Sequence, residues 1–181
     1  MVCGKCLQKR PSYFQALSVF KYDQTSRDLI AKFKYFDQIH LTKYFSKLML
    51  QKSEDIIGDI DFIVPVPLHK FRIIRRKYNQ SALLAKNISK LSKKESILDL
   101  LIRTKNNKPQ ASLNQKKRQK NVAGIFKVEE KYLPKIKGKN ILLLDDVKTT
   151  GATVESCCRI LKKSGINRVY VLTLARTVIS Q

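Results

Sequence analysis

The chain has 181 residues, 43% of them hydrophobic, and its 37 lysines and arginines against 14 acidic residues give a net charge of +23. This length and hydrophobic content predict one domain with a real core and a small appendage. No apolar run approaches the ~20 residues that a membrane span requires, and the N-terminus lacks the hydrophobic stretch of a signal peptide. We therefore expect a cytoplasmic protein without a membrane span.

The N-terminal part is predicted to form one strand and two helices. Residues 16–22 alternate between apolar and polar side chains, as a half-buried strand does. Thr25 and Ser26 are the N-cap candidates for a first helix. Apolar residues at helical spacing, including Phe45 and Met49, predict a second helix. We expect these helices to pack above or beside a sheet.

A buried strand and a strongly basic loop follow. Residues 61–67 predict a strand that its prolines bring to an end, because proline cannot donate a hydrogen bond. Five cations and no acid lie between positions 69 and 77. Such a charge attracts nucleic acid, pyrophosphate or anionic lipid, although lysine also simply fills solvated positions in basic proteins. The candidate contact residues are Arg72, Arg75, Arg76 and Lys77.

A second basic loop lies further along the chain. Helical spacing predicts a helix around residues 83–91, and residues 97–102 form an apolar run that predicts a strand. Seven cations and no acid then fall between positions 103 and 120. A functional loop and a solvated basic linker are both open interpretations, since long loops are usually functional or disordered. Its candidate residues are Arg103, Lys105 and Arg118.

The main candidate catalytic and ligand-binding residues follow the strand predicted at residues 141–144. Asp145 and Asp146 follow that strand, and a helix predicted from Val154 ends near Gly165. A loop at the carboxyl end of a buried strand binds ligands in open α/β sheets, and the N–H groups of the first helical turn attract anions. Carboxylates accept hydrogen bonds from ribose hydroxyls. The candidate phosphate-binding residues are Lys148, Thr149, Thr150, Gly151, Ala152 and Thr153.

This loop has three other interpretations. No Walker A sequence occurs in the chain. A receiver domain carries its acid pair near its start, whereas this pair lies at residue 145 of 181. An ordinary turn with a solvated acidic cap is the third. With strands also at residues 124–128 and 168–174, the alternation of strands and helices predicts an α/β fold with a mostly parallel sheet flanked by helices.

Residues 145–153, Asp-Asp-Val-Lys-Thr-Thr-Gly-Ala-Thr, resemble the PRPP-binding motif of type I phosphoribosyltransferases, and their wider setting is similar to the ComF family of competence-associated proteins. The resemblance implies a type I phosphoribosyltransferase-like domain over residues 16–181. It also implies PRPP or another phosphoribosyl ligand with Mg²⁺, a pyrophosphate loop at residues 69–77 and a flexible closing loop at residues 103–122. Lys77 and Tyr78 stand where the family has Gly-Phe.

The N-terminal cysteines extend the resemblance. ComF proteins commonly carry a zinc ribbon before the first strand, and Cys3 and Cys6 look like its last CxxC pair, within a segment of residues 1–15. A Zn²⁺ site needs two more ligands. The half-site has three interpretations: lost zinc, a site completed by a second molecule, or a trimmed start. Cys157 and Cys158 are predicted as core thiols instead.

Two functions of different class follow. The ComF resemblance implies a role in DNA uptake during natural transformation, with single-stranded DNA and a competence helicase as partners. The alternative is an active phosphoribosyltransferase, in which Asp145 and Asp146 are catalytic and ribose 5-phosphate passes from PRPP to an unknown acceptor. Fold alone does not decide between them.

Overall fold

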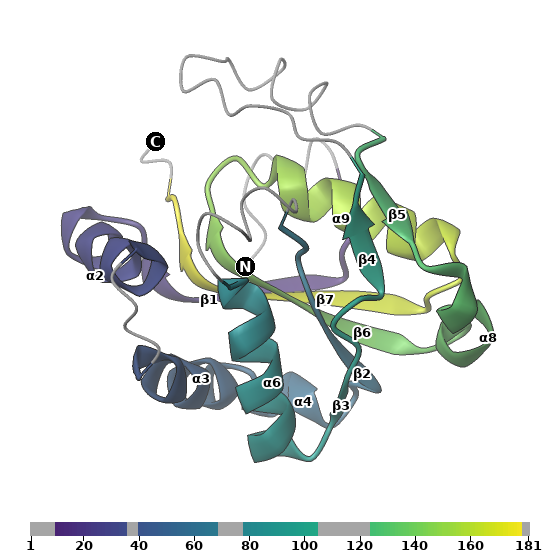
Figure 1. Cartoon of the computed structure of the whole chain (residues 1–181), viewed down its shortest axis with the longest axis horizontal. Coiled ribbons are helices and arrows are strands. Elements are labelled where there is room, and N and C mark those ends of the chain that lie inside the picture. The colour runs from purple at the N-terminus through teal and green to yellow at the C-terminus, as the bar shows by residue number, and fades with distance from the viewer. Residues whose placement is uncertain (1–9, 36–39, 69–77, 105–123, 179–181) are drawn as a thin grey trace.

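A parallel five-stranded sheet forms the centre of the protein (Figure 1). The computed structural model describes residues 10–35, 40–68, 78–104 and 124–178. In spatial order the strands of the sheet are β1 (Gln15–Lys21), β7 (Arg168–Arg176), β6 (Asn140–Lys148), β2 (Phe62–Pro65) and β3 (Glu95–Ser96). Neighbouring strands are all parallel. The predicted α/β architecture with a mostly parallel sheet is therefore confirmed.

Helices cover both faces of this sheet. One face carries α9 (Ala152–Lys163) and α8 (Leu133–Ile136), the short helix η1 (Glu130–Tyr132), and a small antiparallel sheet of β4 (Leu101–Arg103) and β5 (Phe126–Val128). The other face carries α2 (Gln24–Tyr35), α3 (Leu41–Lys52), α4 (Glu54–Ile57) and α6 (Gln80–Ser92). Figure 1 shows α3 and α6 on the side away from α9. Among the described residues, no helix has the length and hydrophobicity to cross a bilayer.

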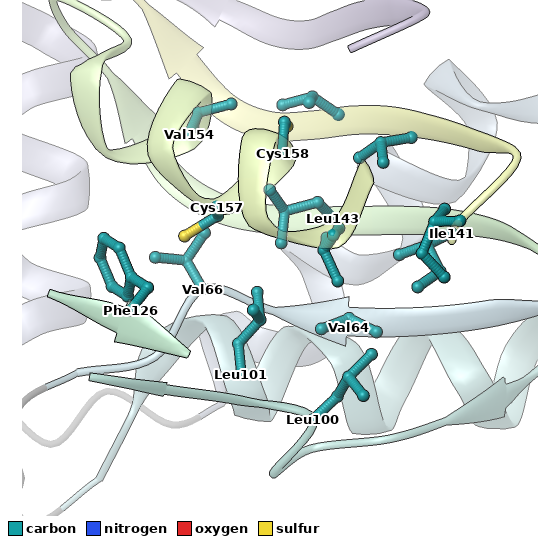
Figure 2. Close-up of a cluster of buried hydrophobic side chains, with 14 of the residues drawn as sticks. Val64, Val66, Leu100, Leu101, Phe126, Ile141, Leu143, Val154, Cys157 and Cys158 are labelled. Atoms are coloured by element: carbon teal, nitrogen blue, oxygen red, sulfur yellow. The ribbon is translucent and has the colours of Figure 1, made fainter. Parts of the chain in front are cut away.

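The unbroken apolar run of β6 supplies two hydrophobic cores at once. Side chains of a strand alternate between the faces of its sheet, so Ile141 and Leu143 pack with α9, whereas Leu142 and Leu144 pack with α3 and α6. All four are fully buried. Figure 2 shows the first of these cores, to which Leu143 of β6 and Cys158 of α9 both contribute. Because β6 is buried on both faces, its position is fixed from both sides.

The start of α2 differs from the prediction. The cap was predicted at Thr25 or Ser26, but the helix begins at Gln24 and Asp23 precedes it. The Asp23 carboxylate accepts a hydrogen bond from the Ser26 N–H at 2.9 Å, and the Ser26 Oγ accepts one from the Asp23 N–H at 2.9 Å. This reciprocal arrangement is a capping box. It lowers the pKa of Asp23, chiefly through the Ser26 backbone N–H.

The single strand predicted at residues 97–102 is wrong. The chain leaves the main sheet after β3, turns at residues 98–100 and enters the separate β4–β5 sheet. Asp99 lies in the turn, and its carboxylate accepts hydrogen bonds from the Lys131 ammonium at 2.7 Å and the Tyr132 hydroxyl at 2.6 Å. The strand predicted at residues 124–128 corresponds to β5, so it also lies outside the parallel sheet.

Candidate phosphoribosyl site

The acid pair lies on a strand rather than in a loop. The sequence predicted that the strand ends at residue 144, but β6 continues to Lys148. Pairing with β7 holds this extension, since Asp145 is opposite Thr173 and Lys148 is opposite Arg176. The prediction of a loop at residue 145 is therefore wrong, although the acids do lie at the carboxyl end of β6.

A tight turn at residues 149–151 joins β6 to α9. Gly151 has φ +75°, a left-handed conformation that glycine adopts without strain. A Cβ atom at this position would come within 3.1 Å of the Lys148 Cε. The Gly151 carbonyl accepts the Glu155 N–H at 2.8 Å, and the Thr150 Oγ1 lies 3.4 Å from the Ala152 N. The turn is thus close-packed against Lys148 and leads directly into the first turn of α9.

The two carboxylates are held by nearby donors. Asp145 Oδ1 accepts the Asp146 N–H at 2.9 Å and lies 3.3 Å from the hydroxyl of Ser81, which donates to it. Asp146 Oδ1 accepts the Val147 N–H at 2.6 Å. Asn79 caps α6 by accepting the Ser81 N–H at 3.1 Å, which sets the position of Ser81. Sequence reasoning missed Ser81; an asparagine ahead of the helical spacing, Asn79, is the signal that could have located this helix start.

An open depression lies over the turn. Its volume is about 200 Å³, including the solvent at its mouth. Its lining residues are Asp145, Val147, Lys148, Thr149, Thr150, Gly151, Ala152, Thr153 and Val154. These include all six residues predicted to bind phosphate, together with one of the two predicted acids. Successive side chains of a strand point to opposite faces, and within the described part Asp146 does not line the depression.

The donors around this depression fit a phosphorylated ribose. Thr149 and Thr150 are exposed and Thr153 is half-buried, so three hydroxyl groups surround the turn. The N–H groups at the start of α9 and the positive end of its dipole favour an anion there. A carboxylate beside such an anion site suits the hydroxyl groups of a sugar, which donate hydrogen bonds. The role of each residue in binding remains a prediction.

The buried face of α9 carries two cysteines, Cys157 and Cys158, behind the turn (Figure 2). Burial raises the pKa of the Cys157 thiol well above its ordinary value, and burial likewise raises that of Cys158. Their prediction as core thiols is confirmed. In the parts of the chain that the structure describes, no three histidine, cysteine or acidic side chains form a metal-binding group. Cys3 and Cys6 lie outside these parts.

Most residues of the basic loops that were predicted to contact a ligand lie outside the described residues. These are Arg72, Arg75, Arg76, Lys77, Lys105 and Arg118. Arg103 is described: it ends β4, and its guanidinium lies 5.7 Å from the ring centroid of Phe126. Phe126 packs in the same core as Val154, in the first turn of α9. The second basic segment therefore starts on the α9 side of the sheet.

Sequence reasoning also missed two residues near the N-terminus. Tyr13 accepts a hydrogen bond from the Lys148 ammonium at 2.7 Å, and Ser12 donates two hydrogen bonds to Glu155. No local pattern pointed to these contacts, because they join positions more than 130 residues apart. The N-terminal segment thus reaches the turn at residues 149–151 from outside the strand–turn–helix unit.

Comparisons with known proteins agree with this architecture. Residues 63–179 match the family described as phosphoribosyl transferase domain. The chain is 30% identical to competence protein F of Haemophilus influenzae, over 96% of this chain and 78% of the relative. It is 31% identical to the DNA utilization protein YhgH of Escherichia coli, over 97% of this chain and 78% of the relative. Competence protein ComFC of Bacillus subtilis is 29% identical, over 90% of this chain and 65% of the relative.

A solved structure shares the fold. The glutamine phosphoribosylpyrophosphate amidotransferase of B. subtilis aligns with a TM-score of 0.53 at 18% identity, over 78% of this chain and 30% of that chain. At this identity the likeness concerns the fold alone. The family match over residues 63–179 and the relatives at 30% and 31% identity show that the chain belongs to the phosphoribosyl transferase domain family and, within it, to the ComF group of competence proteins.

Proposed function

We propose that this protein binds a phosphorylated ribose, as PRPP or another phosphoribosyl ligand, and acts in the cytoplasm in the handling of DNA taken up during natural transformation. The single observation that carries the ligand is the depression at the end of β6, which brings Asp145 together with the hydroxyl-rich turn at residues 149–153. The names of the relatives, competence protein F and DNA utilization protein, support the role in DNA uptake.

Each side of the depression takes one part of the ligand. The N–H groups at the start of α9 and the hydroxyls of Thr149 and Thr150 bind the 5′-phosphate. Asp145, which lines the depression, accepts hydrogen bonds from the ribose hydroxyls. Magnesium, when bound with PRPP, offsets the charge of the pyrophosphate. The basic residues around Arg75 and Arg76 hold the pyrophosphate end through bidentate hydrogen bonds.

Calorimetry with PRPP and Mg²⁺ tests the ligand. The wild type should bind, and a double variant Asp145→Asn, Asp146→Asn should lose about tenfold or more in affinity, since each lost hydrogen bond contributes about 0.5–1.5 kcal/mol. The matched control is Glu54→Gln, Asp55→Asn, which neutralises an adjacent exposed acid pair on α4 and should bind as the wild type does. Equal binding by the wild type and the Asp145, Asp146 variant would refute the ribose assignment.

A gel-shift assay tests the contact with single-stranded DNA. Retention on a labelled strand should fall steeply as salt rises, because a protein that neutralises several phosphates releases as many counterions. Charge reversal at Arg75 and Arg76 should weaken retention and flatten the salt dependence. Unchanged retention would exclude the basic loop as the DNA surface. A helicase partner can be sought by co-purification with the competence helicase.

Transfer of the ribose 5-phosphate to an acceptor is the second candidate. Asp145 lines the depression where the sugar is expected, and a carboxylate there can offset the positive charge that develops on the ribose during transfer. Release of pyrophosphate from PRPP should then depend on an added nucleobase. Screening a set of nucleobases with the wild type and the Asp145→Asn variant tests this: release that needs both the base and Asp145 supports transfer.

A further inference from the structure

Ser12 and Tyr13, directly ahead of β1, contact the residues on either side of the turn at residues 149–151, called the phosphate turn below. Tyr13 accepts a hydrogen bond from the Lys148 ammonium at 2.7 Å, and Lys148 Nζ lies 4.7 Å from the centroid of the Tyr13 ring. The Ser12 N–H and hydroxyl donate to the two carboxylate oxygens of Glu155 at 3.0 and 2.6 Å. Lys148 precedes residues 149–151 and Glu155 follows them in α9. The turn is thus held from outside at both ends.

The contacting segment is itself attached to the sheet. The Phe14 N–H donates to the Val169 carbonyl at 2.7 Å, directly ahead of the pairing of β1 with β7. The Phe14 ring packs edge-on against Tyr170 at 5.3 Å, and the Arg168 guanidinium lies 4.4 Å from its centroid. Ser12 and Tyr13 therefore act from a fixed position, so they can restrain the turn rather than merely follow it.

Charge gives these contacts a consequence for anion binding. Glu155 lies in the first turn of α9, where its negative charge opposes an anion bound at the same helix start. Ser12 engages both of its oxygens, and the Arg159 guanidinium lies 3.5 Å from one of them. Such charge-assisted hydrogen bonds hold a carboxylate in place and offset part of its charge. The Lys148 stem lies close enough to the turn that a Cβ atom added at Gly151 would come within 3.1 Å of the Lys148 Cε.

We propose that Ser12 and Tyr13 are positioning residues of the phosphate turn. Tyr13 holds the Lys148 ammonium beside the turn, and Ser12 holds the Glu155 carboxylate in an orientation that tolerates the phosphate of the ligand. Because coupling between two sites is reciprocal, a ligand in the turn also stabilises the attachment of residues 12–14. This inference rests on the proposed binding of a phosphorylated ribose.

The test uses the full chain, with ribose 5-phosphate and Mg²⁺-PRPP as separate probes in calorimetry. Tyr13→Phe keeps the ring and removes the hydroxyl, and Ser12→Ala removes one of the two donors. Each change should lower the affinity for both probes about three- to tenfold, which is the range expected from the loss of one hydrogen bond. The matched control is Tyr132→Phe, which removes a phenol bonded to Asp99 at 2.6 Å and should leave affinity unchanged.

A double-variant cycle separates positioning from general stability. In a Glu155→Gln background the charge that Ser12 restrains is absent. Ser12→Ala should therefore lower the affinity for ribose 5-phosphate less than it does in the wild type. Equal losses in both backgrounds would overturn the role of Ser12. A loss for Tyr132→Phe as large as that for Tyr13→Phe would show a general stability effect and overturn the role of Tyr13.

Hydrogen exchange of the wild type provides a measurement that needs no variant. Ligand should slow exchange of the Ser12 and Phe14 amides, which are hydrogen-bonded to Glu155 and Val169. Unchanged exchange with ligand bound would contradict the reciprocal coupling. If the wild type binds neither probe, the proposed function and the inference both fall. If it binds them and the Tyr13 and Ser12 variants bind equally well, the inference alone falls.

Discussion

The two ends of the parallel sheet use similar polar residues in opposite ways. At the amino end, Asp61 accepts the Asn140 N–H at 2.8 Å, and the Asn140 side chain donates to the Asp59 carbonyl at 2.9 Å. The Tyr170 hydroxyl donates to the Asp59 carboxylate at 3.3 Å. At the carboxyl end, Asp145 lines an open depression instead. Polar residues at the amino end thus join neighbouring strands, whereas Asp145 at the carboxyl end faces an open depression.

This difference teaches that an acid at a strand end is informative only together with its partners. Asp61 and Asp145 each lie beside a buried apolar strand and look alike in the sequence. Asp61 bonds to the backbone of the adjacent strand, and its contribution is to stability. Asp145 lies next to a turn with a left-handed glycine and the start of a helix. We therefore expect substitutions at the two ends to affect different measurements.

The largest effect is expected from a pair of glycine substitutions, one at each end. Gly151→Ala and Gly138→Ala both place a Cβ on a left-handed backbone, with φ +75° and +72°, which costs about 1–2 kcal/mol of stability. The added Cβ at Gly151 also meets Lys148 at 3.1 Å, whereas that at Gly138 meets no atom within 4 Å. Thermal unfolding should show a lower melting temperature for both variants than for the wild type. PRPP affinity should fall tenfold or more, by about 1.4 kcal/mol, only for Gly151→Ala; equal affinities would contradict the functional difference between the two ends.

An intermediate effect is expected at the amino end. Asp61→Ala leaves the Asn140 N–H without its carboxylate acceptor, and we expect a loss of about 1–2 kcal/mol in the free energy of unfolding. Denaturant titration measures this loss. PRPP affinity should stay as in the wild type under conditions where the variant is folded. A fall in affinity would mean that the two ends are energetically coupled.

The smallest effect concerns an acid at the carboxyl end that serves as a helix cap. The pKa of Asp23 is lowered from its ordinary value of 3.8, mainly by the hydrogen bond from the Ser26 N–H. Its contribution to stability is therefore complete above that value and is lost as pH falls through the lower folded-state pKa. Unfolding followed from neutral pH to below 3.8 should show a slightly steeper acid loss in the wild type than in Asp23→Asn, which keeps a capping side chain. Parallel curves would show that the capping box does not stabilise the fold through its charge.

The parts of the fold that were predicted correctly are those determined by residues close together in the sequence. The apolar run of β6 and the helix that ends near Gly165 depend on burial and on local backbone preferences. The continuation of β6 through Asp145 was missed because pairing with β7 extends a strand whatever its side chains are. The turn at Asp99 was missed because the apolar residues around it look like one strand.

The site shows the same division between local and distant contacts. The residues that line the depression are nearly consecutive, so their types and their order after a strand pointed to a ligand. Ser81 comes from another helix, and Ser12 and Tyr13 come from the opposite end of the chain. Contacts of this kind depend on tertiary structure, which no periodicity in the sequence encodes.

The strand order also determines when this site can be completed during synthesis. β1 pairs with β7, and Ser18 is hydrogen-bonded to Thr173 across 155 positions. Translation proceeds from the N-terminus, so β1 leaves the ribosome long before β7 is synthesised. Until then the backbone groups of β1 cannot form their hydrogen bonds to β7. We therefore expect Ser12 and Tyr13, which directly precede β1, to reach their places beside Lys148 and Glu155 only after β7 has been synthesised.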